Sequence, residues 1–114
     1  MKYAVIITPI AEAELRTAFE YIHKDSPVLA QRWLQTLYDK IASLEKFPER
    51  CAIAPDSAFV GEELRHMVVR SHRVIFRLEK SRRSVQVVGI RHGARLFIGE
   101  APPREQDERD DAGQ

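Results

Sequence analysis

The second half of the chain carries basic side chains of the types that bind or cleave phosphate esters. Metal-free RNA cleavage needs a base for the 2′-hydroxyl proton, a cation for the crowded phosphate and an acid for the leaving oxygen. His92 can be the base or the acid because histidine titrates near neutrality, and Arg65, Arg73 or Arg95 can supply the cation. The candidates for contact with a target or partner are Arg65, Arg73, Arg77, Arg91, His92 and Arg95.

The same residues also have a purely structural interpretation. His92 can form hydrogen bonds at a strand end, and the arginines can form a solvated face or ion pairs with a protein partner. All three tyrosines lie in the first third of the chain, at Tyr3, Tyr21 and Tyr38, so none follows the predicted strands. Two further histidines, His66 and His72, are too few to hold zinc without a nearby acid, so we expect no metal and no cofactor.

Composition limits the class of protein. A chain of 114 residues is about one domain, and 44% hydrophobic with 31% charged residues supports a small core under a charged surface. Cys51 is the single cysteine, which rules out an internal disulfide. No apolar run approaches the roughly 20 residues that span a membrane, and the first residues read as a strand and not as a signal peptide. We therefore expect a cytoplasmic protein.

Charge is distributed unevenly along the chain. Residues 61–99 hold 9 Lys+Arg against 3 Asp+Glu, whereas residues 100–114 hold 2 against 6, within a total of +1. A basic half favours a nucleic acid or an acidic protein as partner. Residues 100–114 are almost wholly charged, Pro, Gly or Gln, so we predict a folded domain over 1–99 and a disordered acidic tail over 100–114.

The first half reads as one strand and two helices. Residues 2–8 alternate as a strand, and Thr8 followed by Pro9 is a helix-start signal. Ser26 followed by Pro27 repeats that signal, and the second helix is expected to run to about Phe47. The short connection predicts an antiparallel helix hairpin, with Trp33 in the core.

The second half reads as a loop followed by three strands. Residues 48–63 contain prolines and no clean period, so we predict a loop with at most a short turn. Residues 64–70, 72–79 and 84–91 alternate as strands with short connections, which predicts an antiparallel meander. The result is a β-α-α-β-β-β fold of the α+β class, with the helix hairpin on one face of a mostly antiparallel sheet. The other face is expected to lie partly open and to be lined by arginines.

This order resembles the toxins of bacterial type II toxin–antitoxin modules, the RelE/ParE superfamily. The matching stretches are the opening Tyr3-Ala4-Val5-Ile6-Ile7-Thr8-Pro9, then Leu44-Glu45-Lys46-Phe47-Pro48, then His72-Arg73-Val74-Ile75-Phe76-Arg77, and last Ile90-Arg91-His92-Gly93-Ala94-Arg95. The likeness covers about residues 2–98. The helix hairpin and the His92-Gly93-Ala94-Arg95 ending resemble the ParE side of the superfamily.

The resemblance implies a toxin that inhibits DNA gyrase by protein binding, without enzyme activity, and that a cognate antitoxin neutralises. Operator DNA would be contacted only through that antitoxin. One alternative is a RelE-like, metal-independent endoribonuclease that cleaves messenger RNA on the ribosome. A second alternative is a non-toxic relic that only binds its antitoxin and regulates the operon.

Overall fold

The computed structural model describes residues 2–93, which form one sheet, a long helix hairpin and one short helix. The strands are β1 (Ala4–Ile7), β2 (Ala52–Ile53), β3 (Arg65–Val69), β4 (His72–Glu79) and β5 (Ser84–His92). The helices are α1 (Pro9–Asp25), α2 (Pro27–Ala42) and α3 (Ser57–Val60). Three short 3₁₀ turns cover Ser43–Glu45, Pro48–Arg50 and Lys80–Arg82.

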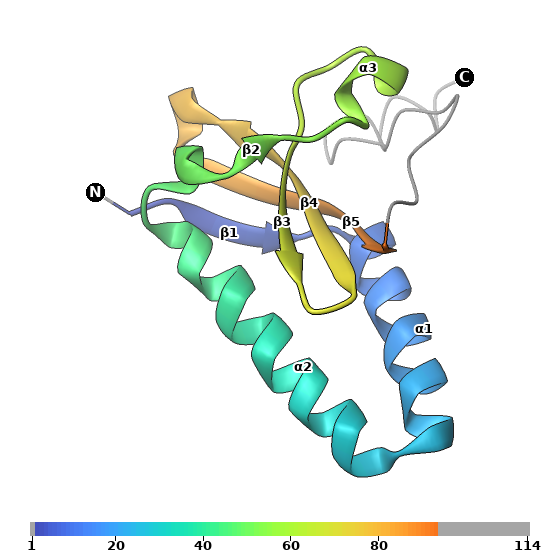
Figure 1. Cartoon of the computed structure of the whole chain (residues 1–114). Coiled ribbons are helices and arrows are strands. Elements are labelled where there is room, and N and C mark those ends of the chain that lie inside the picture. Colours follow the sequence, from blue (N-terminus) through green and yellow to red (C-terminus); the bar gives the residue numbers. More distant parts are fainter. Residues whose placement is uncertain (1, 94–114) are drawn as a thin grey trace, which may run out of the picture.

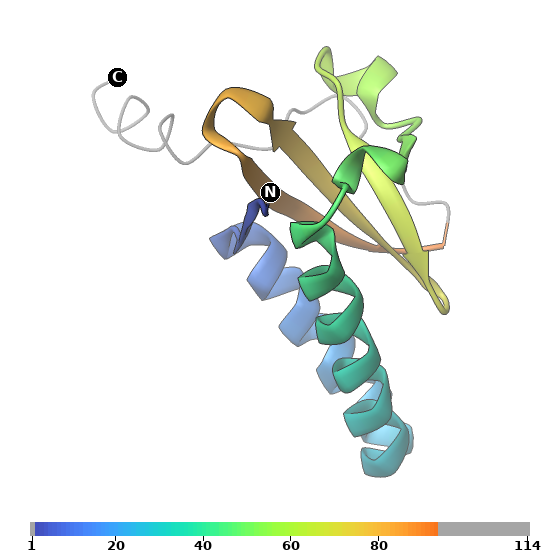
Figure 2. The ribbon, with the colours of Figure 1, turned by 90° about the vertical axis from the view of Figure 1, so that its left-hand side faces the viewer.

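The five strands lie in the order β1-β5-β4-β3-β2. β1 pairs parallel with β5, and every other neighbouring pair is antiparallel. The helix hairpin packs on one face of this sheet, and the turn between α1 and α2 extends past the sheet (Figures 1 and 2). The predicted α+β class and the helix hairpin on a mostly antiparallel sheet are thus confirmed.

Both predicted helix starts are present. The Thr8 side chain accepts a hydrogen bond from the Ala11 N–H at 3.4 Å, and its Oγ1–H donates to the Val87 carbonyl at 2.8 Å. Ser26 accepts from the Leu29 N–H at 3.1 Å. These side chains satisfy backbone donors that a helix end leaves without an internal partner.

Helix α2 ends earlier than the sequence suggested. Its last residue is Ala42, a 3₁₀ turn follows, and Phe47 adopts a left-handed φ of 50°. The prediction that this helix runs to Phe47 is wrong by about five residues. The reason is local, because the backbone must already turn back before Pro48, and a residue that precedes proline is disfavoured in helical geometry.

The main core lies between the helix hairpin and the sheet. Trp33 is 4% exposed there, as predicted, beside Leu37, Phe76 and Val87. A smaller cluster lies on the opposite sheet face and consists of Ala54, Leu64, Ile75 and Val88, with Val60 packed against it.

That second cluster corrects two expectations. Residues 48–63 contain β2 and α3 in addition to turns, and the segment covers part of the sheet face that was expected to be open. Arg73 and Arg77 on that face are only 6% and 2% exposed, so the expectation of an open, arginine-lined face is wrong. The segment can cover the two arginines because it carries a carboxylate for each, Asp56 for Arg73 and Glu62 for Arg77.

The described residues contain no helix long and apolar enough to cross a membrane. Arg95 and the acidic tail, residues 100–114, lie outside the described residues.

Candidate functional site

Arg73 on β4 is the centre of a buried polar cluster. Its guanidinium donates to both carboxylate oxygens of Asp56, at 2.7 and 3.2 Å, and its Nε–H donates to the Gly93 carbonyl at 3.0 Å. The Asp56 side chain is fully buried. A bidentate arginine–carboxylate pair is a strong, directional contact, so Arg73 fastens the segment before α3 to the sheet and holds the end of β5.

His66 on β3 belongs to the same cluster. An Arg73 Nη–H lies 3.0 Å from His66 Nδ1. Since a guanidinium can only donate, Nδ1 must accept, and the ring proton sits on Nε2. Burial, and secondarily the positive charge of Arg73, lowers the pKa of His66. The ring therefore stays neutral and serves as an acceptor.

Arg77 is fixed in the same way four residues further along β4. It donates from Nε and Nη2 to the two carboxylate oxygens of Glu62, at 2.8 and 2.9 Å, and from Nη1 to Gln86 at 3.1 Å. Gln86 in turn donates to Glu79 at 2.8 Å. Arg73 and Arg77, the two arginines of β4, are thus both bound to protein carboxylates.

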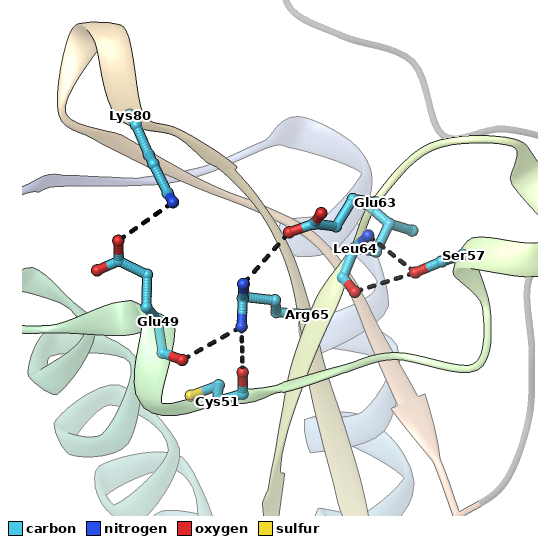
Figure 3. Close-up of polar contacts among 7 residues, drawn as sticks. All are labelled: Glu49, Cys51, Ser57, Glu63, Leu64, Arg65 and Lys80. Atoms are coloured by element: carbon cyan, nitrogen blue, oxygen red, sulfur yellow. Dashed lines mark hydrogen bonds and ion pairs between the residues drawn. The ribbon is translucent and has the colours of Figure 1, made fainter.

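Arg65, at the start of β3, holds the loop that precedes β2 (Figure 3). One of its Nη atoms donates to the carbonyls of Glu49 and Cys51, at 3.2 and 2.7 Å, and the other pairs with Glu63 at 3.3 Å. Lys80 pairs with the Glu49 carboxylate at 3.5 Å in the same region. Arg65 therefore acts as a clamp on backbone carbonyls.

Arg91 and His92 lie together at the other end of the sheet. They line a groove of about 610 Å³ between α1 and the C-terminal half of β5. Both predicted candidates thus face one hollow, separate from the buried arginine clusters. The full lining is Ala13, Glu14, Thr17, Ala18, Tyr21, His72, Ile90, Arg91 and His92.

Glu14 joins helix α1 to β5 inside this groove. Its carboxylate accepts a hydrogen bond from the Ile90 N–H at 2.8 Å and lies 3.4 Å from an Nη atom of Arg91. Burial raises the pKa of Glu14, and the hydrogen bond from Ile90 and the charge of Arg91 oppose that rise. Glu14 thus occupies a stretch of β5 edge that β1 does not reach, because β1 pairs only as far as Val87.

The two groove histidines face each other across β4 and β5. His72 and His92 are register partners with ring centroids 5.0 Å apart, and His72 also contacts the Trp33 ring at 5.1 Å. The Ser71 hydroxyl lies 3.1 Å from His72 Nδ1. Burial, and secondarily the charge of His92, lowers the pKa of His72.

The sequence pointed to neither Glu14 nor Tyr21 as a site residue, and it considered His72 only as one of a pair with His66. Tyr21 is 73% exposed on α1, Glu14 lies on the same helix, and His72 is the first residue of β4. Only the helical spacing of 14, 17, 18 and 21 placed their helix face together, and nothing in the sequence placed that face beside β5. The groove combines a phenol, two imidazoles, and a guanidinium that is paired with the Glu14 carboxylate, and these groups together can transfer protons.

No group of three or more possible metal-ligating side chains occurs among residues 2–93.

The comparisons with known proteins point to one group of toxins. A chromosomal ParDE toxin–antitoxin system from P. aeruginosa contains a chain with 19% identity and a TM-score of 0.64, where 81% of this chain aligns with 97% of that one.

A second similar structure is the RelBE2 toxin–antitoxin complex from Mycobacterium tuberculosis. Its matching chain has 18% identity and a TM-score of 0.54, with 83% of this chain aligned to 95% of that one. At such identities the likeness shows the fold. No match was found among curated protein sequences. The family model described as the ParE toxin of the type II toxin–antitoxin system parDE matches residues 5–97, and the chain therefore belongs to the ParE toxin family of the RelE/ParE superfamily.

Proposed function

We propose that this protein is the toxin of a ParDE-like module that inhibits DNA gyrase by binding it, and that a cognate antitoxin neutralises it. Family membership supports the toxin role. The choice of gyrase as target rests on the resemblance to ParE proteins, since gyrase binding has no residue signature of its own.

The observation that carries the binding mechanism is the state of the β4 arginines. A metal-free ribonuclease needs a cation that reaches the phosphate. Arg73 and Arg77 are buried and neutralised by Asp56 and Glu62, so an RNA phosphate would have to displace a bidentate carboxylate from each. This arrangement favours a scaffold role for these arginines.

The antitoxin partner is supported by the two similar structures, both of which are toxin–antitoxin systems. Large apolar side chains are exposed along the helix hairpin of this chain, among them Ile10, Tyr21, Val28, Leu29 and Tyr38. A partner that covers them together with nearby basic residues would be amphipathic and acidic. Such a partner at 100 times its dissociation constant would stabilise the fold by about 2.7 kcal/mol.

A supercoiling assay with purified gyrase tests the proposal. We expect the protein to block supercoiling of relaxed plasmid, and its cognate antitoxin to restore it. The antitoxin should also raise the melting temperature of the toxin. Normal supercoiling at a large molar excess of toxin would exclude gyrase as the target, and an unchanged melting temperature at saturating partner would exclude that partner.

The groove gives the ribonuclease alternative one specific observation in its favour. His92, Arg91 and Tyr21 line the same hollow, and these are the side-chain types that can supply base, cation and acid. The test is primer extension on messenger RNA after induction. New 5′ ends that vanish in both His92→Ala and Tyr21→Phe would establish the nuclease, and we expect none.

A further inference from the structure

A second hollow lies where the helix hairpin meets the turn between β3 and β4. Its volume is about 330 Å³. The pocket has an apolar floor, and its lining also includes two guanidinium groups and one hydroxyl group. The lining residues are Ile22, Leu29, Arg32, Trp33, Arg70 and Ser71.

The two arginines of this pocket differ from those described above. Arg32 and Arg70 are exposed, and neither forms a hydrogen bond or ion pair with another residue of the described part of the chain. Arg65, Arg73 and Arg77, by contrast, are all bound to protein oxygens. Arg70 also has a left-handed φ of 57°, a backbone conformation that a residue other than glycine adopts at an energetic cost. Two unpaired cations at one apolar hollow make a site for an anionic group with an apolar neighbour.

Trp33 gives the pocket an apolar wall. Its side chain lines the pocket and is almost fully buried, and its Nε1–H has no hydrogen-bond acceptor among residues 2–93. Because the Nε1 atom itself is closed off, the anchors for an anionic group are the two guanidinium groups, and a carboxylate is the anion that a protein chain can offer.

The chain itself carries such carboxylates shortly after its last described residue, Gly93. The Gly93 N–H donates to the Ser71 carbonyl at 2.8 Å, so the last described residue touches a residue of the pocket lining. The family model ends at residue 97, so the acidic segment 100–114 is an addition to the part shared with the family. Its acidic residues are Glu100, Glu105, Asp107, Glu108, Asp110 and Asp111.

We infer that the Arg32–Arg70–Trp33 pocket is a carboxylate-binding site and that the acidic segment 100–114 of the same chain occupies it. The two guanidinium groups would pair with the carboxylates beside the apolar side chains of the pocket. The segment is long enough to extend to the pocket, because the 12 residues that follow Gly93, up to Glu105, can span up to about 40 Å. A tether of this length gives an effective concentration near millimolar, so a weak carboxylate contact is enough for occupancy.

This inference is independent of the cellular target. In the free toxin the segment would shield the two cations where the helix hairpin meets the turn between β3 and β4. Any acidic partner that uses the same pocket would have to displace it. Since both arginines are exposed, the contact should weaken as salt rises.

The experiment uses the full-length protein and its single tryptophan. One tryptophan gives one indole N–H cross-peak in a ¹H–¹⁵N NMR spectrum, and that peak reports directly on Trp33. All six side-chain carboxylates of the tail are removed in place by the combined substitutions E100Q, E105Q, D107N, E108Q, D110N and D111N. The pocket is neutralised separately by R32Q with R70Q, and R82Q is the matched control, since Arg82 is an exposed arginine in the 3₁₀ turn Lys80–Arg82.

We expect the neutral tail to shift the Trp33 indole peak. In the neutral-pocket variant the peak should no longer respond to the charge of the tail, so adding the tail substitutions should cause no further shift. Added salt should move the wild-type peak the same way, and R82Q should leave it in place. An indole peak that is identical in the wild type and in the neutral-tail variant would overturn the inference. The inference would also be overturned if the peak did not respond to the tail substitutions but shifted when the antitoxin binds. That result would assign the pocket to the partner and would leave the proposed toxin function intact.

Discussion

Arg73 and Asp56 form a buried ion pair through two hydrogen bonds of 2.7 and 3.2 Å, although 17 residues separate them in sequence. The pair joins the segment before α3 to β4, and it explains why the second face of the sheet is closed. Taking two charges out of water is expensive, and the pair is tolerated because the geometry is bidentate and further acceptors satisfy the remaining donors.

Removal of one member of this pair should therefore be strongly destabilising. We expect Asp56→Asn or Arg73→Met to lower the free energy of unfolding by about 3–5 kcal/mol, because each leaves a buried charge without its counter-ion. Urea unfolding of both single variants and of the double variant measures the effect. The double variant should lose clearly less unfolding free energy than the sum of the losses in the two single variants.

Lys80 and Glu49 provide the matched control for that prediction. Their side chains are 65% and 33% exposed at a distance of 3.5 Å. Exposed pairs contribute about 0–1 kcal/mol, so Lys80→Gln should cost little. Equal losses for Lys80→Gln and Asp56→Asn would contradict the assignment of the buried pair as the device that closes this face.

Acidification should destabilise the fold through His66 and His72. Their pKa values are lowered in the folded chain, mainly by burial, with the charge of Arg73 acting on His66 and that of His92 on His72. Their contribution to stability is thus fully present above the unfolded value of about 6.5 and is lost as pH falls through the folded values. Unfolding free energies measured from about pH 7.5 down to about pH 5 should show this loss.

Substitution of His66 isolates one half of that effect. His66→Asn keeps an acceptor for Arg73 and removes the titrating ring, so the loss on acidification should become smaller. His23→Asn is the control, because His23 is exposed on α1. An unchanged pH profile in His66→Asn would show that His66 does not contribute to the acid sensitivity.

The fold could be predicted where local signals and periodicity agreed. Thr8-Pro9 and Ser26-Pro27 fix the helix starts because capping and proline geometry act within three residues. The alternation of residues 72–79 and 84–91 fixes their pairing because short connections leave no other partner. These features depend on neighbours in sequence, so the sequence contains their cause.

The contacts that define the candidate sites are of another kind. Asp56 and Glu62 lie in a segment without a period, and their arginine partners are 17 and 15 residues away. Tyr21 reaches the groove only because α1 packs beside β5. Such pairings depend on how whole elements dock. The arginines of β4 therefore looked like a phosphate-binding face in the sequence and are ion-paired supports in the structure.

Thr8 should be more important for stability than the equivalent Ser26. Thr8 is 5% exposed and both caps α1 and donates to the Val87 carbonyl, whereas Ser26 caps α2 at an exposed site. We expect Thr8→Ala to cost about 2 kcal/mol and Ser26→Ala about 1 kcal/mol or less. Thr8→Ser keeps both hydrogen bonds and should retain most of the stability in thermal unfolding. A larger loss for Ser26→Ala than for Thr8→Ala would contradict this order.

Glu14 should stabilise the protein through its hydrogen bond and not through its charge. Burial raises the pKa of Glu14 despite the nearby Arg91. Its contribution is therefore fully present below the unfolded value of about 4.3 and is lost as pH rises through the folded value. Glu14→Gln keeps an oxygen for the Ile90 N–H and is neutral at every pH.

The comparison of Glu14→Gln with Glu14→Ala separates the two contributions. We expect Glu14→Gln to be at least as stable as the wild type near neutral pH, with the difference vanishing in acid, because the amide never carries the charge that burial penalises. Glu14→Ala removes the acceptor and should cost about 1–3 kcal/mol, since the Ile90 N–H is then left without a partner at the β5 edge. Urea unfolding at neutral and acid pH measures both, and hydrogen exchange at the Ile90 amide reports the bond itself. Equal destabilisation by the two substitutions at neutral pH would mean that the ion pair with Arg91 outweighs the burial cost, and that Glu14 holds α1 to β5 by charge.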